Sequence, residues 1–134
     1  MLLTEQNKEV VLRFNKEFMQ QYNVAVLNDI VADDFTNHTA AGNFRKDKQG
    51  LIDFVGMMHK GFSEFAIEIF EQVAENDLVA TRKIIRAKHT GEIMGKQATN
   101  KDVEFNVIDM VRLRDGKYID HWGRNDVMQV IQSL

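Results

Sequence analysis

The N-terminal part of the chain has the apolar spacing of amphipathic helices. In the first segment the large apolar side chains recur every three or four residues, at Val11, Phe14, Phe18 and Tyr22. Charged and amide side chains fill the positions between them, so one face is apolar and the opposite face is polar. The pattern predicts a helix from Thr4 to Tyr22.

Two further helices are predicted before Gly61. Residues 24–31 form a short apolar segment that ends at Asp33 and Asp34, which predicts a second helix. Residues 35–44 are rich in small and polar side chains without a helical period, and they predict a loop. A third helix is expected over residues 47–60, where the apolar side chains again fall on one face.

After Gly61 the apolar period changes to two, which is the alternation of strands. Four strands are predicted, over residues 67–73, 78–90, 103–112 and 118–123. The pair Asp115 and Gly116 is typical of a two-residue hairpin turn between the last two strands. Residues 127–134 predict a short terminal helix that packs back on the sheet.

Helices followed by a meander of strands indicate an α+β fold, with three N-terminal helices on one face of an antiparallel sheet. A chain of 134 residues has the size of one domain, so residues 1–134 are expected to form a single domain. The strand over residues 103–112 is partly apolar on both faces, whereas a sheet with one solvated face alternates more cleanly. We therefore expect a homodimer in which a second copy covers the outer face of the sheet.

Composition narrows the classes of function. The chain has no cysteine, which excludes disulfides and thiolate catalysis. Its formal net charge is -3 and its lysines and arginines are scattered, so a nucleic-acid partner is not expected. No apolar run is long enough to cross a bilayer and no secretory signal begins the chain, which predicts a cytoplasmic protein without a membrane partner.

No motif with a mechanism of its own is present, such as a phosphate-binding glycine loop or a metalloprotease helix. The histidines lack the spacing of metal ligands; they are His38, His59, His89 and His121. Neither a metal nor a cofactor is expected. Isolated polar residues in apolar surroundings remain, and this pattern is typical of a pocket for a small apolar molecule.

Asp109 is the sharpest candidate for chemistry. It shares a strand face with Phe105, Val107 and Val111. A carboxyl group buried among such neighbours has its charged form disfavoured, which raises its pKa and allows it to act as an acid or as a hydrogen-bond donor to an oxyanion. A carboxylate paired with a cation or held by backbone groups is the competing hypothesis, and the pattern does not decide between the two.

His121 and His38 are the candidate bases. His121 follows Ile119 on one strand face and could act as a base, or as a structural histidine beside Trp122. His38 lies in the predicted loop and could close the mouth of a pocket or lie exposed on the surface. The candidate ligand-binding residues, which are equally compatible with a core, are Phe14, Phe18, Phe54, Met58, Phe105, Val107 and Trp122.

Five short stretches stand out together: Asn37-His38, His89-Thr90-Gly91, the six residues from Val107 to Arg112, Asp115-Gly116-Lys117 and His121-Trp122. Together they resemble the SnoaL-like polyketide cyclases of the nuclear transport factor 2-like superfamily. The resemblance covers nearly the whole chain. It implies a strongly curved sheet that forms a cone with one pocket, and acid/base chemistry without a cofactor.

The resemblance also implies roles for single residues. The catalytic aspartate of the cyclases matches Gly123, and the pocket histidine that assists it matches Asp109. In the related ketosteroid isomerases a protonated aspartate of the oxyanion hole occurs in a strand context similar to that of Asp109. The isomerase base lies near His38, and the isomerase helix tyrosine lies near Phe14, which has no hydroxyl group.

The sequence thus supports two hypotheses. The first is a cyclase, isomerase or hydratase acting on an apolar carbonyl compound, with Asp109 as acid or oxyanion donor and His38 or His121 as base. The second is a non-catalytic ligand-binding or dimerisation module of the same fold, which is favoured by Gly123 at the position of the cyclase aspartate.

Overall fold

The computed structural model describes residues 1–134. Its elements are, in chain order, α1 (Leu3–Arg13), the π-helix η1 (Phe14–Gln20), the 3₁₀-helix η2 (Val24–Val26), α2 (Leu27–Ile30), β1 (Val31–Asn37), α3 (Lys48–Gly61), β2 (Phe62–Glu75), β3 (Leu78–His89), β4 (Asp102–Arg114), β5 (Lys117–Asn125) and α4 (Val127–Gln132). No helix is both long and apolar enough to cross a membrane.

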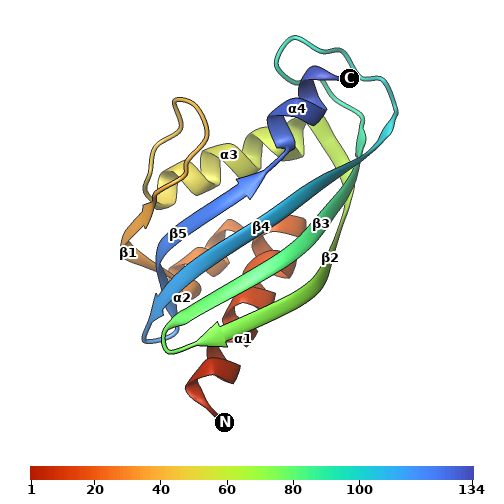
Figure 1. Cartoon of the computed structure of the whole chain (residues 1–134). Coiled ribbons are helices and arrows are strands. Elements are labelled where there is room, and N and C mark those ends of the chain that lie inside the picture. The colour runs from red at the N-terminus through yellow and green to blue at the C-terminus, as the bar shows by residue number, and fades with distance from the viewer.

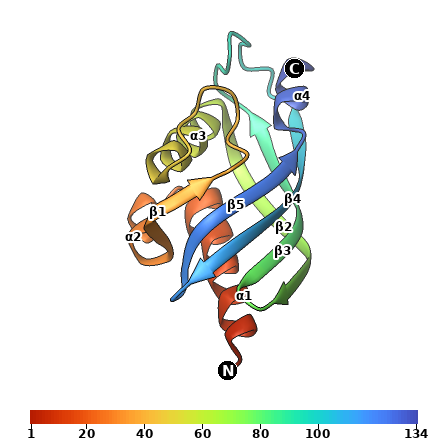
Figure 2. The same ribbon diagram turned by 60° about the vertical axis from the view of Figure 1, so that its left-hand side comes forward.

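One curved sheet organises the fold. The strand order is β1-β5-β4-β3-β2, in which β1 runs parallel to β5 and the other neighbours are antiparallel. The sheet bends around α1 and α3, which lie on its concave side (Figure 1). Figure 2 shows β1 and α2 beside β5, at the edge of the sheet opposite β2. The predicted α+β class, with N-terminal helices against the sheet, is confirmed.

The first predicted helix is one continuous helical segment with two geometries. After Arg13 the α-helix widens into the π-helix η1. A π-helix holds more residues per turn, so adjacent pairs of side chains can share the inner face. Phe14, Asn15 and Phe18 are all buried there. The amide Nδ2 of Asn15 donates to the carbonyl oxygen of Val11 at 2.9 Å, which fixes the buried amide in place.

The sequence prediction was wrong at β1. Residues 35–37, expected to begin a loop, and Val31, expected to end a helix, belong to a seven-residue strand. The strand has no clean alternation because its pairing with β5 is irregular between Val31 and Thr36, and because it lies at the sheet edge. Asn37 pairs with His121 of β5, so the strand carries a polar side chain to the concave face.

The other strands lie where the alternation predicts them, and most extend a few residues further. Asp115 and Gly116 both have positive φ, 53° and 75°, which is the turn geometry that the Asp-Gly pair favours between β4 and β5. The predicted terminal helix is α4, and its buried Val127 and Ile131 pack back against the core.

The core divides into two clusters of buried side chains. One, around Phe18, joins the N-terminal helices to β4 and β5, and the other, around Phe62 and Phe105, joins the end of α3 to β3, β4 and α4. Phe18 and Phe105 are fully buried, and the rings of Phe62 and Phe105 meet edge to face at 5.2 Å. Members of both clusters line a cavity, so the fold holds a hollow bounded by both parts of its core.

Candidate active site

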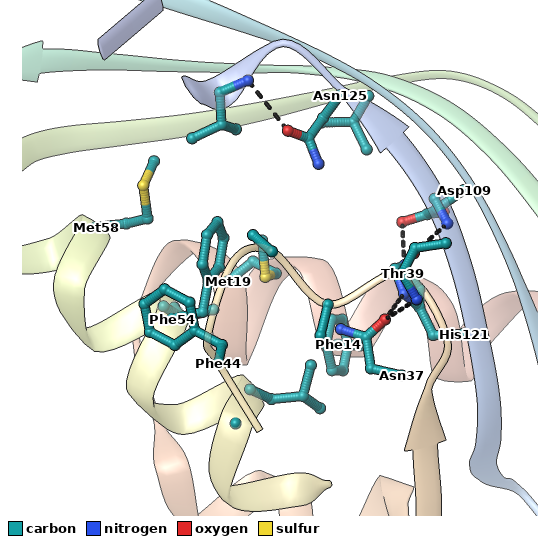
Figure 3. Close-up of a pocket in the computed structure, with 18 of the residues that line it drawn as sticks. Phe14, Met19, Asn37, Thr39, Phe44, Phe54, Met58, Asp109, His121 and Asn125 are labelled. Carbon is teal, nitrogen blue, oxygen red and sulfur yellow. Dashed lines mark hydrogen bonds and ion pairs between the residues drawn. The ribbon is translucent and has the colours of Figure 1, made fainter. Parts of the chain in front are cut away.

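A cavity lies between the concave face of the sheet and the helices. The volume of this cavity is about 120 Å³, so side chains do not fill it. Figure 3 shows aromatic and methionine side chains on one side of the space and polar side chains of β1, β4 and β5 on the other. Its large apolar lining residues are Phe14, Met19, Phe35, Phe44, Leu51, Phe54, Val55, Met58, Phe65, Ile85, Val107 and Val127.

Asp109 projects from β4 into the polar side of this cavity (Figure 3). Its side chain is 13 % exposed, and its Oδ2 lies 3.5 Å from the Nζ of Lys83 and 3.5 Å from the Nε2 of His121. The carboxylate therefore has two nitrogen neighbours and one side open to the cavity. No cluster of three histidine or carboxylate side chains is placed to hold a metal ion.

The orientation of His121 is set by the strand β1. The Oδ1 of Asn37 accepts from the backbone N–H of Thr39 at 3.3 Å and lies 2.9 Å from the Nδ1 of His121. Because that oxygen is an acceptor, Nδ1 carries the proton of the His121 ring. Nε2 then faces Asp109, as a lone pair in the neutral ring and as a donor in the charged ring.

Because Gly123 has no side chain, it makes room for the contact between Asp109 and His121. It is the cross-strand partner of Asp109, and its N–H donates to the Oγ1 of Thr39 at 2.8 Å. A Cβ atom at Gly123 would lie 3.3 Å from the Cβ of Asp109 and 3.0 Å from the Cε1 of His121. A larger side chain at this position would therefore displace one of the two site residues.

The pKa of the Asp109 carboxyl group lies below its ordinary value. Burial raises this pKa, but the charge of Lys83 and the hydrogen bond and charge of His121 together outweigh burial. Of the two sequence hypotheses for Asp109, the lowered pKa favours the carboxylate paired with a cation over the buried acid with a raised pKa; the sequence pattern showed the apolar neighbours of Asp109 and not the lysine from the adjacent strand. An ionised Asp109 accepts protons and does not donate them.

Tyr118 of β5 adds a neutral phenol to the lining. Its ring stacks on that of Phe14 with centroids 4.6 Å apart, and its side chain is buried. Burial first, and then the charge of Asp109, raise the pKa of Tyr118 well above the ordinary value of a tyrosine. The hydroxyl group therefore keeps its proton.

The structure places the predicted ligand-binding residues in three environments. Those that line the cavity are Phe14, Phe54, Met58 and Val107. Phe18 and Phe105 are fully buried in the two core clusters and do not line it, which corrects their assignment to ligand binding. Trp122 alternates with His121 along β5 and points away from the cavity, so its assignment is also corrected.

His38 is likewise outside the cavity. Its Nε2 lies 2.7 Å from the Oδ1 of Asp120, and its ring stacks on that of Trp122 at 4.9 Å. Its backbone N–H donates to the carbonyl oxygen of His121. Neighbouring residues of a strand point to opposite faces, so the register that brings Asn37 to the cavity turns His38 away from it. The role of base in the pocket is corrected accordingly.

Lys83 is the site residue that sequence reasoning missed. The inner face of β3 reads Val79, Thr81, Lys83, Ile85 and Ala87 in strict alternation, so a lysine in a buried register was a visible signal. Its Nζ donates to the Oδ1 of Asn15, which gives the buried ammonium a neutral partner in addition to Asp109. Asn15 gave no signal, because only the π-helix turns it inward.

The family follows from comparison with known proteins. The family model described as SnoaL-like polyketide cyclase matches residues 9–134. The chain belongs to this family. A search of curated proteins found no match. The resemblance of the short stretches around Asp109 and His121 to these cyclases is thereby confirmed at the level of the family.

Solved structures of SnoaL-like folds agree with this membership. IdmH from Streptomyces antibioticus, a candidate polyketide cyclase, is 24 % identical over 95 % of this chain and 96 % of its own, with a TM-score of 0.82. A SnoaL-like candidate cyclase from Jannaschia is 19 % identical over 98 % and 93 %, with a TM-score of 0.84. AclR from Streptomyces galilaeus, a candidate hydroxylase, is 22 % identical over 96 % and 79 %, with a TM-score of 0.83. At these identities, the similarity of the chain to the three solved structures shows a shared fold.

Proposed function

We propose that this SnoaL-like protein catalyses proton transfer on an apolar carbonyl compound, as in a cyclisation or isomerisation, with Asp109 as the general base. The observation that carries the proposal is the Asp109 carboxylate, held 3.5 Å from both Lys83 and His121 with its free side open to an apolar cavity. Because its pKa is lowered, Asp109 is ionised at neutral pH, and a base held beside a bound substrate acts at a high effective concentration.

His121 is the partner of Asp109 in this proposal. In its charged form the ring donates from Nε2 toward Asp109, while Asn37 holds Nδ1. One group can accept a proton from substrate carbon and the other can return a proton to a second atom. Such a pair supplies the proton removal and the proton delivery that an intramolecular aldol closure or a double-bond shift requires.

The apolar side of the cavity favours a substrate with a ring system or another compact hydrocarbon body. Phe44 and Phe54 meet edge to face with centroids 5.4 Å apart, and Met58 lies beside them in the lining (Figure 3). Rings and flexible thioethers adapt to flat apolar ligands. The carbonyl group then points toward the polar end of the cavity, where Asp109 lies.

The test uses exchange of carbon-bound protons. The probe is 2-tetralone, a bicyclic apolar ketone, whose uptake of deuterium from D2O is followed by NMR with and without protein. The wild type is expected to accelerate exchange, and Asp109→Asn to reduce the acceleration by about 100-fold, the usual contribution of a general base. Asp102→Asn, at an exposed carboxylate at the start of the same strand, is the matched control and should leave the rate unchanged.

The alternative function is a non-catalytic binding module, which is favoured by Gly123 at the position of the cyclase aspartate. Under that alternative, 2-tetralone binds and perturbs NMR signals of the cavity lining, but its exchange rate equals that in buffer. Equal rates in wild type and Asp109→Asn would therefore remove the proposed chemistry and leave the module.

We further propose that a second copy of the chain covers the outer face of the sheet. Large apolar side chains are exposed there: Phe70 (38 %), Val73 (67 %), Ile108 (59 %) and Met110 (38 %). Paired charges of both signs surround them, including Arg82 with Glu71 and Arg86 with Glu68 and Glu104. A face that carries both signs can be complementary to itself across a two-fold axis.

Sedimentation analysis tests the dimer. The wild type should sediment as a dimer, and Ile108→Glu should sediment as a monomer because it places a charge on the apolar face. Met94→Glu changes a residue that is similarly exposed, at 56 %, but lies in the loop between β3 and β4, and it should remain dimeric. A wild type that stays monomeric at high concentration would contradict the proposal.

A further inference from the structure

Lys83 is a charged residue in a cavity lining that is mostly apolar. Its side chain is 3 % exposed, and it stands on the inner face of β3 between Thr81 and Ile85. A buried ammonium group is costly unless its three N–H groups and its charge are compensated. Two partners are present, the Oδ1 of Asn15 and the Oδ2 of Asp109 at 3.5 Å. The third N–H has no partner in the protein.

The neighbourhood of Lys83 suggests what that third donor is for. Lys83 contributes to the lining of the same cavity as Asp109, so its free donor and the free side of the carboxylate lie in one enclosed space. In such a space, a fixed donor interacts with developing negative charge more strongly than in water, because a bound substrate displaces the solvent that would compete for it.

We propose that Lys83 donates a hydrogen bond to the carbonyl oxygen of the substrate and stabilises the enolate that forms when Asp109 removes a proton. This inference rests on the proposed function. It adds to that function the group that takes up the negative charge, and it restricts the substrate to compounds whose carbonyl oxygen lies next to the carbon that loses its proton.

The charges balance within the site. The C–H bond breaks, its proton moves to a carboxylate oxygen of Asp109, and its electron pair moves through the carbon framework to the carbonyl oxygen. Before the step Lys83 faces a carboxylate, and after it Lys83 faces an enolate oxygen and a neutral carboxylic acid. The net charge of the enclosed site is the same throughout, so no charge must enter or leave an apolar environment.

The experiment compares Lys83→Met with the wild type in two measurements. In 2-tetralone exchange, Lys83→Met should lower the maximal rate by about 100-fold, as for loss of one oxyanion donor. In a ¹³C NMR titration of the Asp109 carboxyl carbon, the same variant should raise the pKa of that group, because the cation that opposes burial is gone. Lys88→Met, at a half-buried lysine further along β3, should change neither.

The outcomes separate this inference from the proposed function. If Asp109→Asn abolishes exchange while Lys83→Met stays within about twofold of the wild type, the role of Lys83 is overturned and the base survives. If the pKa of Asp109 rises but the exchange rate does not fall at a pH where Asp109 is ionised, Lys83 only positions the carboxylate, and the proposal is again overturned. If the wild type shows no exchange, the proposed function itself fails.

Lys83→Met also leaves the buried Oδ1 of Asn15 without a donor, which destabilises the variant for a reason unrelated to exchange. The double variant Asn15→Leu with Lys83→Met removes both polar groups and restores an apolar contact between η1 and β3. It should fold at least as well as Lys83→Met and show the same loss of exchange and the same raised pKa of Asp109.

Discussion

Asp109→Leu is expected to lower the free energy of unfolding by about 3 kcal/mol, the low end for breaking a buried ion pair. The substitution removes the only carboxylate beside Lys83, whose side chain is 3 % exposed. The ammonium group then lies in an apolar setting with Asn15 as its one protein partner. The low end applies because Asp109 is 13 % exposed and water in the cavity can approach the lysine.

A double-mutant cycle isolates the pair. Lys83→Met should destabilise the protein by a similar amount, whereas Lys83→Met with Asp109→Leu should be more stable than either single variant, because no uncompensated charge remains. Denaturant unfolding of the four proteins measures this coupling. Additive losses would show that the two side chains do not interact, and the account of an ionised Asp109 would lose its electrostatic basis.

Phe105→Ala is expected to lower the free energy of unfolding by about 4 kcal/mol, as for loss of a buried ring that leaves a cavity. Phe105 is buried from solvent and does not line the cavity, and its ring packs edge to face on Phe62. Its neighbours come from β3, α3 and α4, so collapse around the missing ring is restricted from several sides.

The control for Phe105 is Leu12→Ala in α1, outside the face assigned to the dimer. Leu12 is 45 % exposed, so its loss should cost about 1 kcal/mol or less in unfolding free energy. Binding of 2-tetralone should be unchanged in Phe105→Ala at temperatures where the variant is folded. Weakened binding there would return Phe105 to the ligand-binding set.

Much of the fold could be predicted from the sequence because local signals agree with tertiary packing. Helical periodicity located the N-terminal helix and α3, and alternation with the Asp115-Gly116 turn located the β4–β5 hairpin. The strand β1 could not be predicted in this way. Its parallel pairing with β5 joins segments more than eighty residues apart, and neither its irregular register nor its exposed Asp33 and Asp34 resemble an alternating strand.

The site was predictable only in part. Asp109 and His121 stood out as polar residues on strand faces, and both lie at the cavity. His38 and Trp122 could not be assigned correctly without the register of β1 and β5, which turns both to the outer face. The protonation state of Asp109 depended on Lys83 from the neighbouring strand, and single-strand patterns carry no information on such cross-strand pairs.

The ion pair also fixes how the site depends on pH. Since the pKa of Asp109 is lowered in the folded state, the pair stabilises the protein at pH values above the unfolded-state value of about 3.9. This stabilisation is lost as the pH falls through the folded-state pKa. A base with a lowered pKa is ionised throughout the neutral range, so any exchange activity lost in that range must be traced to another group.

The most direct test of an ionised base in a closed apolar pocket is a ¹³C NMR titration of the Asp109 carboxyl carbon in the wild-type protein. The account predicts a midpoint below about 3.9, the value of an exposed aspartate. A midpoint above that value would contradict the account, because burial would then outweigh Lys83 and His121, and a midpoint above the neutral range would make Asp109 an acid rather than the base proposed for this SnoaL-like site.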